Sequence, residues 1–422
     1  MEKNMSVQNT VESLAVAAKK AARKLAFEST TRKNNVLLRM AETLQEQKKF
    51  IQSENEKDLL AGREKSLSDA MLDRLALTDK VIDAMVVGLH DVAALPDPVG
   101  EIEEMIRRPN GLMVGRMRIP LGVIGMIYES RPNVTVDAAA LCLKSGNAVI
   151  LRGGSEAIHS NLALAKVLQE ALASENINPA AIQVIPVTDR EAVNVLLSME
   201  EHLDLIIPRG GEGLIRFVAQ NSRIPVLKHY KGVCHVFVDS KADFTAAAEI
   251  IMNGKTQRPG VCNALETLLV HQDIAADFLP QIGTRLTAAG VEIRGCPQTQ
   301  NILADIKSAT EDDWYAEFLD LILAVRVVDN LDAAMDHIDT YGSQHTEVIV
   351  TADYTNAQRF IKEVDASAVM VNASTRFSDG GQFGLGAEIG ISTTKLHAYG
   401  PMGLKELTAR KFIVYGDGQI RT

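Results

Sequence analysis

The sequence predicts an α/β protein built from two tandem Rossmann-like domains with parallel sheets. Short apolar runs alternate with helical patterns, first over residues 122–207 and again over residues 234–372. Such alternation is typical of βαβ units, whose consecutive strands run parallel. The chain has 422 residues, which is enough for two or three domains that each bury a core of their own.

A helical lead-in and a small arm precede the first series. Residues 8–62 and 67–96 carry helical patterns rich in Ala, Leu, Lys and Glu. Two short runs then flank Pro109-Asn110-Gly111, and Asn-Gly between such runs indicates a β-hairpin. The last segment, 407–422, has the pattern of a terminal strand. We therefore expect a small β arm, and these patterns leave open whether it contacts a second copy of the chain.

Each apolar run of the two series is a candidate strand. In the first series, the expected strands are 122–128, 148–152, 182–186 and 203–207, with helices over 136–146 and 159–174. In the second, the expected strands are 234–238, 266–271, 291–294, 321–328, 347–350 and 368–372, with helices over 331–338 and 355–364. The alternation places these strands in two parallel sheets.

Composition and charge exclude several classes of protein. The formal net charge of -10 argues against nucleic-acid binding, which draws its affinity from clustered Lys and Arg. The longest strongly apolar stretches, such as 319–325, are far shorter than the roughly 20 residues of a membrane-spanning helix. The polar start of the chain lacks the apolar segment of a signal peptide. We therefore expect a cytoplasmic protein.

The cysteines do not show the paired spacing of a zinc ribbon or a redox CxxC motif. In a reducing compartment we expect free thiols. Cys142 lies in an apolar helical pattern and Cys234 opens a strand-like run, so both are interpreted as core residues. Cys296 shows no sign of reactivity, and the remaining cysteine is Cys262.

Cys262 lies in a sequence context that suits a nucleophile. It follows the turn-forming pair Pro259-Gly260, and a strand-like run resumes at Glu266. A bend with free backbone N–H groups beside Lys255 and Arg258 can stabilise a thiolate. The alternative is that Cys262 is one more small buried hydrophobe.

Two strand-to-loop junctions are candidates for nucleotide binding, although the chain has no G-x-G-x-x-G after a strand. The strand over 148–152 runs into Gly153-Gly154-Ser155-Glu156, where Arg152 can face a 2′-phosphate. The strand over 203–207 runs into Arg209-Gly210-Gly211, and a helix follows whose amide end can hold a diphosphate. Both junctions are also explained as ordinary glycine turns.

Two further segments carry polar chemistry. The cluster Lys228-His229-Tyr230-Lys231, near Cys234-His235, can bind an anion, bind a metal or form a solvated basic turn. We expect no metal, because the ligand set lacks a carboxylate or a second Cys/His pair. The segment 374–403 is dense in Gly, Ser and Thr, and its Arg376 with hydroxyl-rich flanks suits an α-amino-acid head group.

Taken together, these segments resemble the aldehyde dehydrogenase superfamily and, within it, the gamma-glutamyl phosphate reductase family. The resemblance covers nearly the whole chain, and the matching segments are 119–157, 229–239, 254–271, 341–351 and 371–403. The first segment alone indicates only the superfamily, whereas the set is specific for the reductases. One departure is Tyr399, where an Arg is expected for the family, which leaves the role of this position open.

The resemblance implies a domain order. The cofactor-binding domain would comprise 1–104 and 119–232, and the catalytic domain would comprise 233–400. The oligomerisation arm would comprise 105–118 and 401–422. The chain is therefore expected to form a homo-oligomer.

The resemblance also implies roles for single residues. Cys262 would be the nucleophile, and Asn133 would help to stabilise the oxyanion. Residues implied at the nicotinamide cofactor are Arg152, Gly153, Ser155, Glu156, Arg209, Gly210, Gly211 and Glu317, the last from a loose alignment. Residues expected at the substrate are Arg376, Ser374 and Thr375 for the α-carboxylate, Arg131 as a second candidate, and Lys228 for the leaving phosphate.

The implied activity is that of an NADP-dependent phosphorylating aldehyde dehydrogenase. NADPH would reduce L-glutamyl 5-phosphate to L-glutamate 5-semialdehyde through a Cys262 thioacyl intermediate in proline biosynthesis, and glutamate 5-kinase would be a partner. A hydrolysing semialdehyde dehydrogenase of the same fold is the alternative. It needs a carboxylate base that the corresponding stretch, 226–230, lacks. A catalytically silent scaffold is disfavoured because Cys262 and Asn133 are retained.

Overall fold

The computed structural model describes residues 7–421, and within this range the chain forms two compact units. Unit 1 comprises residues 7–228, 385–390 and 402–421, and unit 2 comprises residues 229–384 and 391–401. The predicted α/β class with two parallel sheets is confirmed, as is the helical lead-in. Among the described residues, no helix has both the length and the apolar character needed to cross a membrane.

The helical lead-in of unit 1 consists of five helices, and three of them have side-chain caps at their starts. Side chains of Ser29, Ser68 and Thr78 accept hydrogen bonds from the first turns of the helices that follow them, which satisfies amide groups that a helix leaves open. The bounds are α1 (Val7–Leu25), α2 (Thr30–Glu46), α3 (Lys48–Glu64), α4 (Asp69–Leu75) and α5 (Asp79–Ala94).

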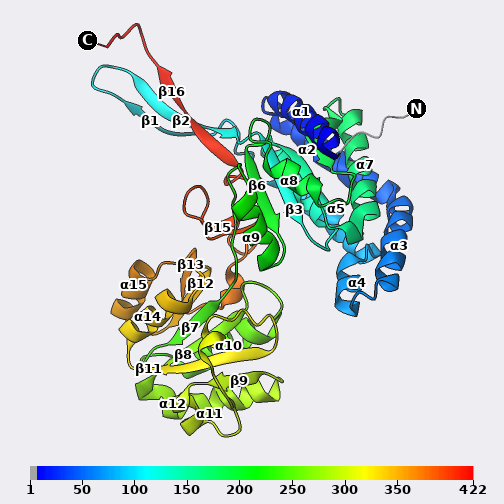
Figure 1. The fold of residues 1–422 in the computed structure, drawn as a ribbon. Coiled ribbons are helices and arrows are strands. Elements are labelled where there is room, and N and C mark those ends of the chain that lie inside the picture. The colour runs from blue at the N-terminus through cyan, green and yellow to red at the C-terminus, as the bar shows by residue number, and fades with distance from the viewer. Residues whose placement is uncertain (1–6, 422) are drawn as a thin grey trace. The chain divides into compact units, whose positions relative to one another are not determined.

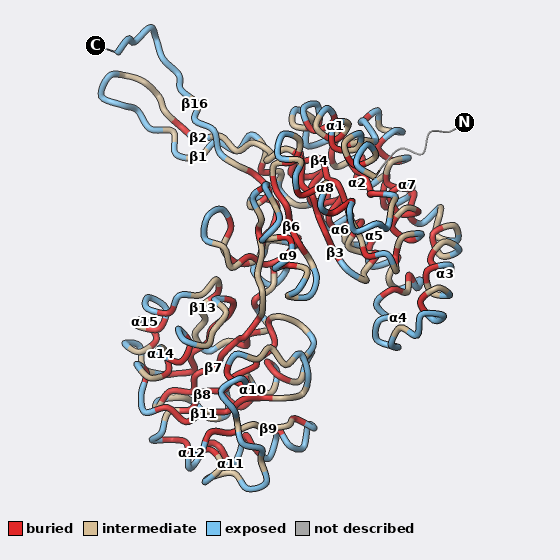
Figure 2. The backbone as a smooth tube through the Cα atoms, in the orientation of Figure 1, coloured by how far each residue is buried: buried red, intermediate tan, exposed pale blue. Residues whose placement is uncertain are grey.

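The sheet of unit 1 has four parallel strands in the order β5-β4-β3-β6. Its strands are β3 (Val123–Tyr128), β4 (Ala148–Arg152), β5 (Ile182–Val184) and β6 (Leu205–Arg209). The connecting helices are α6 (Val134–Lys144), η1 (Ser155–Ala157), α7 (Ile158–Ser174), η2 (Pro179–Ala181) and α8 (Glu191–Leu197), and α9 (Glu212–Asn221) follows β6. Every residue of β3 is buried, as Figure 2 shows in red, because helices cover both faces of the sheet.

The arm is a three-stranded antiparallel sheet in the order β1-β2-β16 that extends from the body of unit 1 (Figure 1). Its strands are β1 (Ile102–Arg107), β2 (Met113–Pro120) and β16 (Thr408–Tyr415). The predicted hairpin is confirmed: Asn110 Oδ1 accepts from the Leu112 amide at 3.3 Å, and Gly111 has φ 89°. The paired strands begin at Ile102 and end at Pro120, slightly beyond the expected limits of 105 and 118.

Unit 2 contains a seven-stranded parallel sheet in the order β10-β9-β11-β8-β7-β12-β13. Its strands are β7 (Cys234–Val238), β8 (Leu265–His271), β9 (Glu292–Gly295), β10 (Lys307–Ser308), β11 (Ile322–Val328), β12 (Thr346–Val350) and β13 (Ala368–Val371). Its helices are α10 (Phe244–Thr256), α11 (Gln272–Ala288), α12 (Pro297–Ile302), α13 (Glu311–Trp314), α14 (Leu331–Tyr341), α15 (Tyr354–Glu363) and η3 (Thr375–Phe377). The short strands β14 (Gly390–Ser392) and β15 (Gly400–Met402) pair with each other.

Two apolar clusters cover the two faces of the unit 2 sheet. On one face, α10 and α11 pack Ile251 and Phe278 against strand residues such as Leu268. On the other, α14 and α15 pack Ile338 and Phe360 against their own set of strand residues. The second predicted series of strands is therefore confirmed, and the sheet provides a rigid base for the loops at its edges.

Candidate functional site

Cys262 lies in the turn between α10 and β8 and is half-buried, whereas the other three cysteines are buried. Cys142 and Cys234 are fully enclosed core residues, as expected. Burial also raises the pKa of both of these thiols, so they stay protonated. Of the four thiols, the one at Cys262 is therefore best placed to meet a ligand.

The turn that carries Cys262 is held by close contacts from the segment before β7. A Cβ atom at position 232 would clash with the Cys262 carbonyl, so Gly232 permits an approach that other residues would prevent. The Gly232 amide donates to Glu317 Oε1 at 2.9 Å, and Cys234 Sγ donates to the Cys262 carbonyl at 3.2 Å. The structure thus brings Glu317 close to the Cys262 turn.

Two histidines lie beside the Cys262 sulfur. One ring nitrogen each of His229 and His345 and the Sγ atom of Cys262 lie within 4.8 Å of one another. The strand order explains this, because β8, β7 and β12 are adjacent and parallel, and these three residues precede those strands in the chain. His345 is buried, which with the neighbouring His229 lowers its pKa to about 3, so its imidazole is neutral. His229 belongs to the basic cluster that the sequence pattern indicates, whereas no sequence pattern pointed to His345.

Positive charge near Cys262 comes from arginines. Arg376 is half-buried, and burial together with the neighbouring Arg258 lowers its pKa, which Asp379 and Cys262 partly offset. Its Nε atom donates to Gln257 Oε1 at 2.9 Å, and Asn263 Nδ2 donates to the Ser378 carbonyl at 2.9 Å. These bonds join the segment containing Arg376 to the Cys262 turn.

The hydroxyl residues beside Arg376 have other surroundings. Ser374 Oγ accepts from the Arg376 amide at 3.3 Å and caps η3. Thr375 is fully buried, and its Oγ1 atom has no hydrogen-bond partner. Of the three residues expected at the α-carboxylate, Arg376 is the most exposed.

Lys255 does not provide the open positive charge that its place in the sequence suggested. It is fully buried, and its Nζ atom lies 2.7 Å from Glu266 Oε2 and 2.9 Å from the Leu265 carbonyl. The helical periodicity of α10 turns this side chain into the interior, where a cation requires a partner. The expectation that Lys255 stabilises the Cys262 thiolate is therefore wrong. The positive charge near this thiol comes from Arg258 and Arg376 instead.

In unit 1, the loops that follow β3, β4 and β6 meet at one edge of the sheet. The three strands are adjacent and parallel, so their carboxyl ends lie together, and ligands of open α/β sheets bind at such an edge. Glu156 Oε1 accepts from the amide and the hydroxyl of Ser130, each at 2.7 Å. Glu129 Oε2 accepts from the Gly211 amide at 2.9 Å.

The residues expected at the cofactor are distributed along this edge. They are Arg152, Gly153, Ser155 and Glu156 after β4, and Arg209, Gly210 and Gly211 after β6. Arg152 donates to the Thr188 carbonyl at 3.0 Å, and its Nε atom is buried without a hydrogen-bond partner. Burial lowers the pKa of Arg152, and the nearby Arg190 contributes to this. The second arginine was not anticipated from the sequence.

The remaining expected residues occupy three places. Asn133 stands at the start of α6, where its Nδ2 atom donates to Asp137 Oδ2 at 3.1 Å. Arg131 lies in the turn just before it, and Lys228 is the last residue of the first segment of unit 1. Tyr399 belongs to unit 2 and donates its hydroxyl to Asp365 Oδ1 at 3.2 Å. Thus Asn133 lies in unit 1, and Cys262 lies in unit 2.

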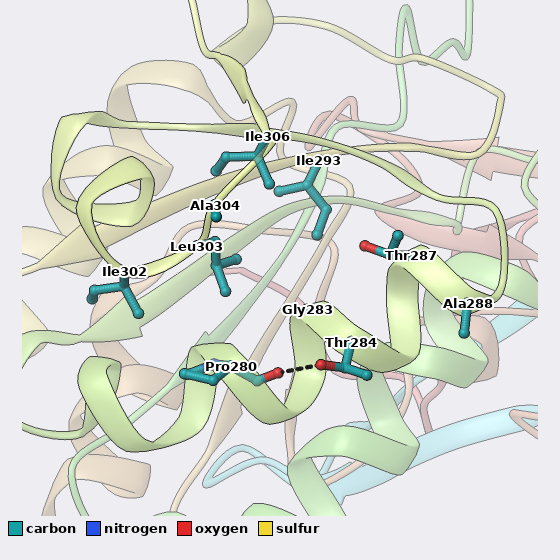
Figure 3. Close-up of a pocket in the computed structure, with 10 residues that line it drawn as sticks. All are labelled: Pro280, Gly283, Thr284, Thr287, Ala288, Ile293, Ile302, Leu303, Ala304 and Ile306. Atoms are coloured by element: carbon teal, nitrogen blue, oxygen red, sulfur yellow. Dashed lines mark hydrogen bonds between the residues drawn. The ribbon is translucent and has the colours of Figure 1, made fainter.

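A separate pocket of about 540 Å³ lies in unit 2 beside α11 (Figure 3). It is lined by Pro280, Gly283, Thr284, Thr287, Ala288, Ile293, Ile302, Leu303, Ala304 and Ile306. The Thr284 hydroxyl donates to the Pro280 carbonyl at 2.8 Å within the helix. This lining offers apolar contact without a nucleophile or an ionisable group, so we assign the pocket no part in the candidate site.

Comparison with known proteins identifies the family. The model of the aldehyde dehydrogenase family matches residues 3–301. The chain is 63% identical to a gamma-glutamyl phosphate reductase of Desulfotalea psychrophila over 99% of this chain and 100% of that protein. It is 61% identical to one of Geotalea daltonii with the same coverage.

A solved structure gives the same result. The crystal structure of gamma-glutamyl phosphate reductase from Thermotoga maritima matches with a TM-score of 0.96 and 49% identity, over 98% of this chain and 100% of that one. Sequence and fold therefore agree over essentially the full length of both chains. The chain belongs to the aldehyde dehydrogenase family and, within it, to the gamma-glutamyl phosphate reductases.

Proposed function

We propose that this protein reduces L-glutamyl 5-phosphate to L-glutamate 5-semialdehyde and releases phosphate, as a step of proline biosynthesis. The observation that carries the proposal is the half-buried Cys262 thiol, held in a tight turn by Gly232 and close to the Arg376 guanidinium. A thiol near positive charge is readily ionised, and the thiolate is the nucleophilic form.

The arginines near Cys262 match the charge of this substrate. L-Glutamyl 5-phosphate carries an α-carboxylate at one end and an acyl phosphate at the other. Arg376 would hold the α-carboxylate, and Arg258, which is exposed and close to Arg376, adds charge to the same region. Arg131 is the second candidate for the α-carboxylate, and Lys228 is a candidate for binding the leaving phosphate.

In the proposed reaction, the Cys262 thiolate attacks the acyl carbon, the carbon–oxygen bond to phosphate breaks, and a thioester remains. The proton of the thiol passes to a ring nitrogen of His229, which lies beside the sulfur. Asn133 would donate to the carbonyl oxygen as it gains negative charge. After reduction, collapse of the hemithioacetal releases the aldehyde and restores the thiolate.

Members of this family use nicotinamide cofactors, and we propose NADPH here. The cofactor, when bound, supplies the hydride that reduces the thioester. The edge formed after β3, β4 and β6 suits it, because the buried Arg152 Nε lacks a hydrogen-bond partner and Arg190 adds a second positive charge. Arg209, Gly210 and Gly211 would lie near the diphosphate. Glu317 would meet the nicotinamide ribose.

The proposed activity is tested in the oxidative direction. Glutamate semialdehyde, NADP⁺ and phosphate are mixed with the enzyme, and formation of NADPH is followed. We expect the rate to depend on phosphate, because phosphate must cleave the thioester. Fast oxidation of the aldehyde to the free acid without phosphate would instead support the hydrolysing alternative.

Replacing Asn133 by Ala is expected to lower kcat by roughly 10²–10³-fold with little change in KM. The amide donates to an oxygen that becomes charged only in the transition state, so its loss affects turnover more than binding. Steady-state kinetics in the phosphate-dependent assay measure both constants. Asn194→Ala, at an exposed side chain of α8, is the control. A rise in KM at constant kcat would assign Asn133 to binding.

Replacing Arg376 by Ala is expected to raise KM for the glutamyl substrate by about 10–100-fold, the value of one charge-assisted hydrogen bond. Arg359→Ala is the matched control in unit 2, because Arg359 is likewise a half-buried arginine, lies on α15 and pairs with Asp332 and Glu363. Unchanged kinetics in Arg376→Ala would remove this residue from the substrate site.

Replacing Arg152 by Ala is expected to raise KM for NADPH by about tenfold or more and KM for NADH by less. The difference arises because only NADPH carries the 2′-phosphate that the guanidinium would contact. The comparison is made in one enzyme with both cofactors, and Arg63→Ala on α3 is the exposed control. An equal effect on both cofactors would place Arg152 away from the 2′-phosphate.

The same proposal covers assembly and location. We propose a cytoplasmic enzyme whose arm, formed by β1, β2 and β16, contacts a second copy of the chain. The arm has apolar side chains in exposed positions, among them Ile106, Phe412 and Val414. Contact with glutamate 5-kinase is part of the proposal, because a labile acyl phosphate is best passed over a short path.

A further inference from the structure

The cluster of His229, Cys262 and His345 has the composition of a zinc site. Cysteine sulfur and imidazole nitrogen are the ligands that Zn²⁺ prefers in proteins. Among residues 7–421, these three form a group in which every ligand atom lies within 4.8 Å of the others. The group combines one thiol with two imidazoles, and the three residues lie in the segments that precede the neighbouring strands β8, β7 and β12.

The hydrogen bond of His229 orients a ring lone pair that a metal can use. His229 Nδ1 lies 3.0 Å from the Ile391 carbonyl, which can only accept, so Nδ1 carries the proton and Nε2 carries the lone pair. His345 Nδ1 lies 2.8 Å from Thr346 Oγ1, and its Nε2 atom is buried with no hydrogen-bond partner. A ring nitrogen that donates to a carbonyl, as His229 Nδ1 does, is the usual arrangement of a metal-binding histidine.

The spacing is close to that of a formed site. The bond lengths of zinc to sulfur and nitrogen imply ligand atoms about 3.4–3.6 Å apart in a tetrahedron. From the upper limit of 4.8 Å, the three atoms must therefore approach one another by at most about 1.2–1.4 Å. His229 and Cys262 are half-buried, whereas His345 is buried.

The charges around the cluster do not prevent binding. Arg376 interacts electrostatically with Cys262, and Arg258 lies beside Arg376. Against these cations, the carboxylates of Glu317 and Glu347 act on the neighbouring Cys234. A single Zn²⁺ bound by one thiolate and two neutral imidazoles would carry one net positive charge, which this mixed surrounding can accept.

We propose that His229, Cys262 and His345 bind a Zn²⁺ ion, with the fourth position open to water, and that the bound ion reversibly blocks the nucleophile. The ion takes the sulfur lone pair, and the thiol proton is released to solvent on binding. The blocking of activity rests on the proposed function, because it assumes that Cys262 is the nucleophile. The binding of the ion does not.

Binding is measured on the full chain with Co²⁺ as a spectroscopic probe and with Zn²⁺ in competition against a chromophoric chelator. We expect a near-ultraviolet thiolate-to-cobalt band in the wild type that Zn²⁺ abolishes and that is absent in Cys262→Ser. In His229→Gln and His345→Gln the apparent affinity should fall by roughly 10–100-fold or more, since even indirect partners of a metal contribute that much. His90→Gln, at an exposed histidine of α5, should bind like the wild type.

A second measurement needs no variant. Zn²⁺ should protect Cys262 of the wild type from iodoacetamide, and a chelator should restore labelling. Absence of the thiolate band, or labelling unaffected by Zn²⁺, would overturn the metal site even if His345→Gln failed to fold.

Activity is measured separately in chelator-treated enzyme. Activity there that Zn²⁺ suppresses and a chelator restores supports the block. Activity that saturating Zn²⁺ leaves unchanged overturns the block. A lack of activity in the metal-free enzyme counts against the proposed function, while the spectrum still decides the site.

Discussion

Cys262→Ala is expected to abolish the phosphate-dependent reduction of NADP⁺ by glutamate semialdehyde, with a fall in kcat of roughly 10⁴–10⁶-fold. The reason is that the thioester cannot form without the sulfur, and the remaining groups cannot replace a covalent step. Because Cys262 is half-buried in a turn, its truncation should leave the fold intact. Steady-state kinetics and circular dichroism on the same preparation measure the two properties.

The matched control for this prediction is Cys296→Ser. Cys296 is buried and stands at the start of α12, where Ser is a favourable residue, so the variant should keep full activity. Iodoacetamide at neutral pH should label Cys262 before the buried thiols of the wild type. If Cys262→Ala kept a substantial fraction of the activity, the proposed chemistry would be wrong.

Lys255→Met is expected to destabilise the folded chain by about 3–5 kcal/mol near neutral pH. Lys255 and Glu266 are both fully buried, and their charged atoms lie 2.7 Å apart. Removal of the lysine leaves the Glu266 carboxylate in the interior without its cation. Urea denaturation followed by circular dichroism measures the free energy of unfolding, with Lys307→Met, whose ion pair with Glu292 is exposed, as a control expected to lose less than about 1 kcal/mol.

The loss should also depend on pH in a definite direction. Burial raises the pKa of Glu266 from 4.5 to about 7, even though Lys255 acts to lower it. The folded state therefore holds this proton more tightly than the unfolded chain does. The contribution of the protonated Glu266 to the free energy of unfolding is complete below pH 4.5, and it is lost as the pH rises through about 7.

Without Lys255 the pKa of Glu266 should rise further. Lys255→Met should therefore lose more stability, relative to the wild type, at about pH 8 than at about pH 5. The double variant with Glu266→Gln should recover much of the loss, since the buried charge is gone. An equal loss at both pH values would show that packing, rather than charge, sets the effect.

Local patterns in the sequence were sufficient to predict most of the helices and strands. A run such as 123–128 is apolar throughout because β3 is buried on both faces, and Gly111 in the hairpin loop has a positive φ of 89°, which glycine adopts without steric cost. These are short-range properties, which the residues themselves carry. The turn at Cys262 belongs to the same group, since Pro259-Gly260 interrupts the helix before it.

Contacts between distant segments could not be derived in this way. Lys255 was expected to stabilise the Cys262 thiolate, because the two residues are close in the chain. The positions of His345 and Arg190 near the two candidate sites could not be predicted from the sequence. Strand order determines these neighbours: β12 lies beside β7, so His345 meets His229, and the inward face of α10 directs Lys255 to Glu266.

By itself, the sequence determined the α/β class, the two parallel sheets, the hairpin and the one cysteine placed in a turn, because each depends on periodicity or on the conformational limits of Pro and Gly. Only the tertiary structure decided which side chains surround that cysteine. The reason is physical: the edge of a parallel sheet assembles residues in the order in which strands pair, and pairing is set by the packing of both sheet faces and not by distance along the chain.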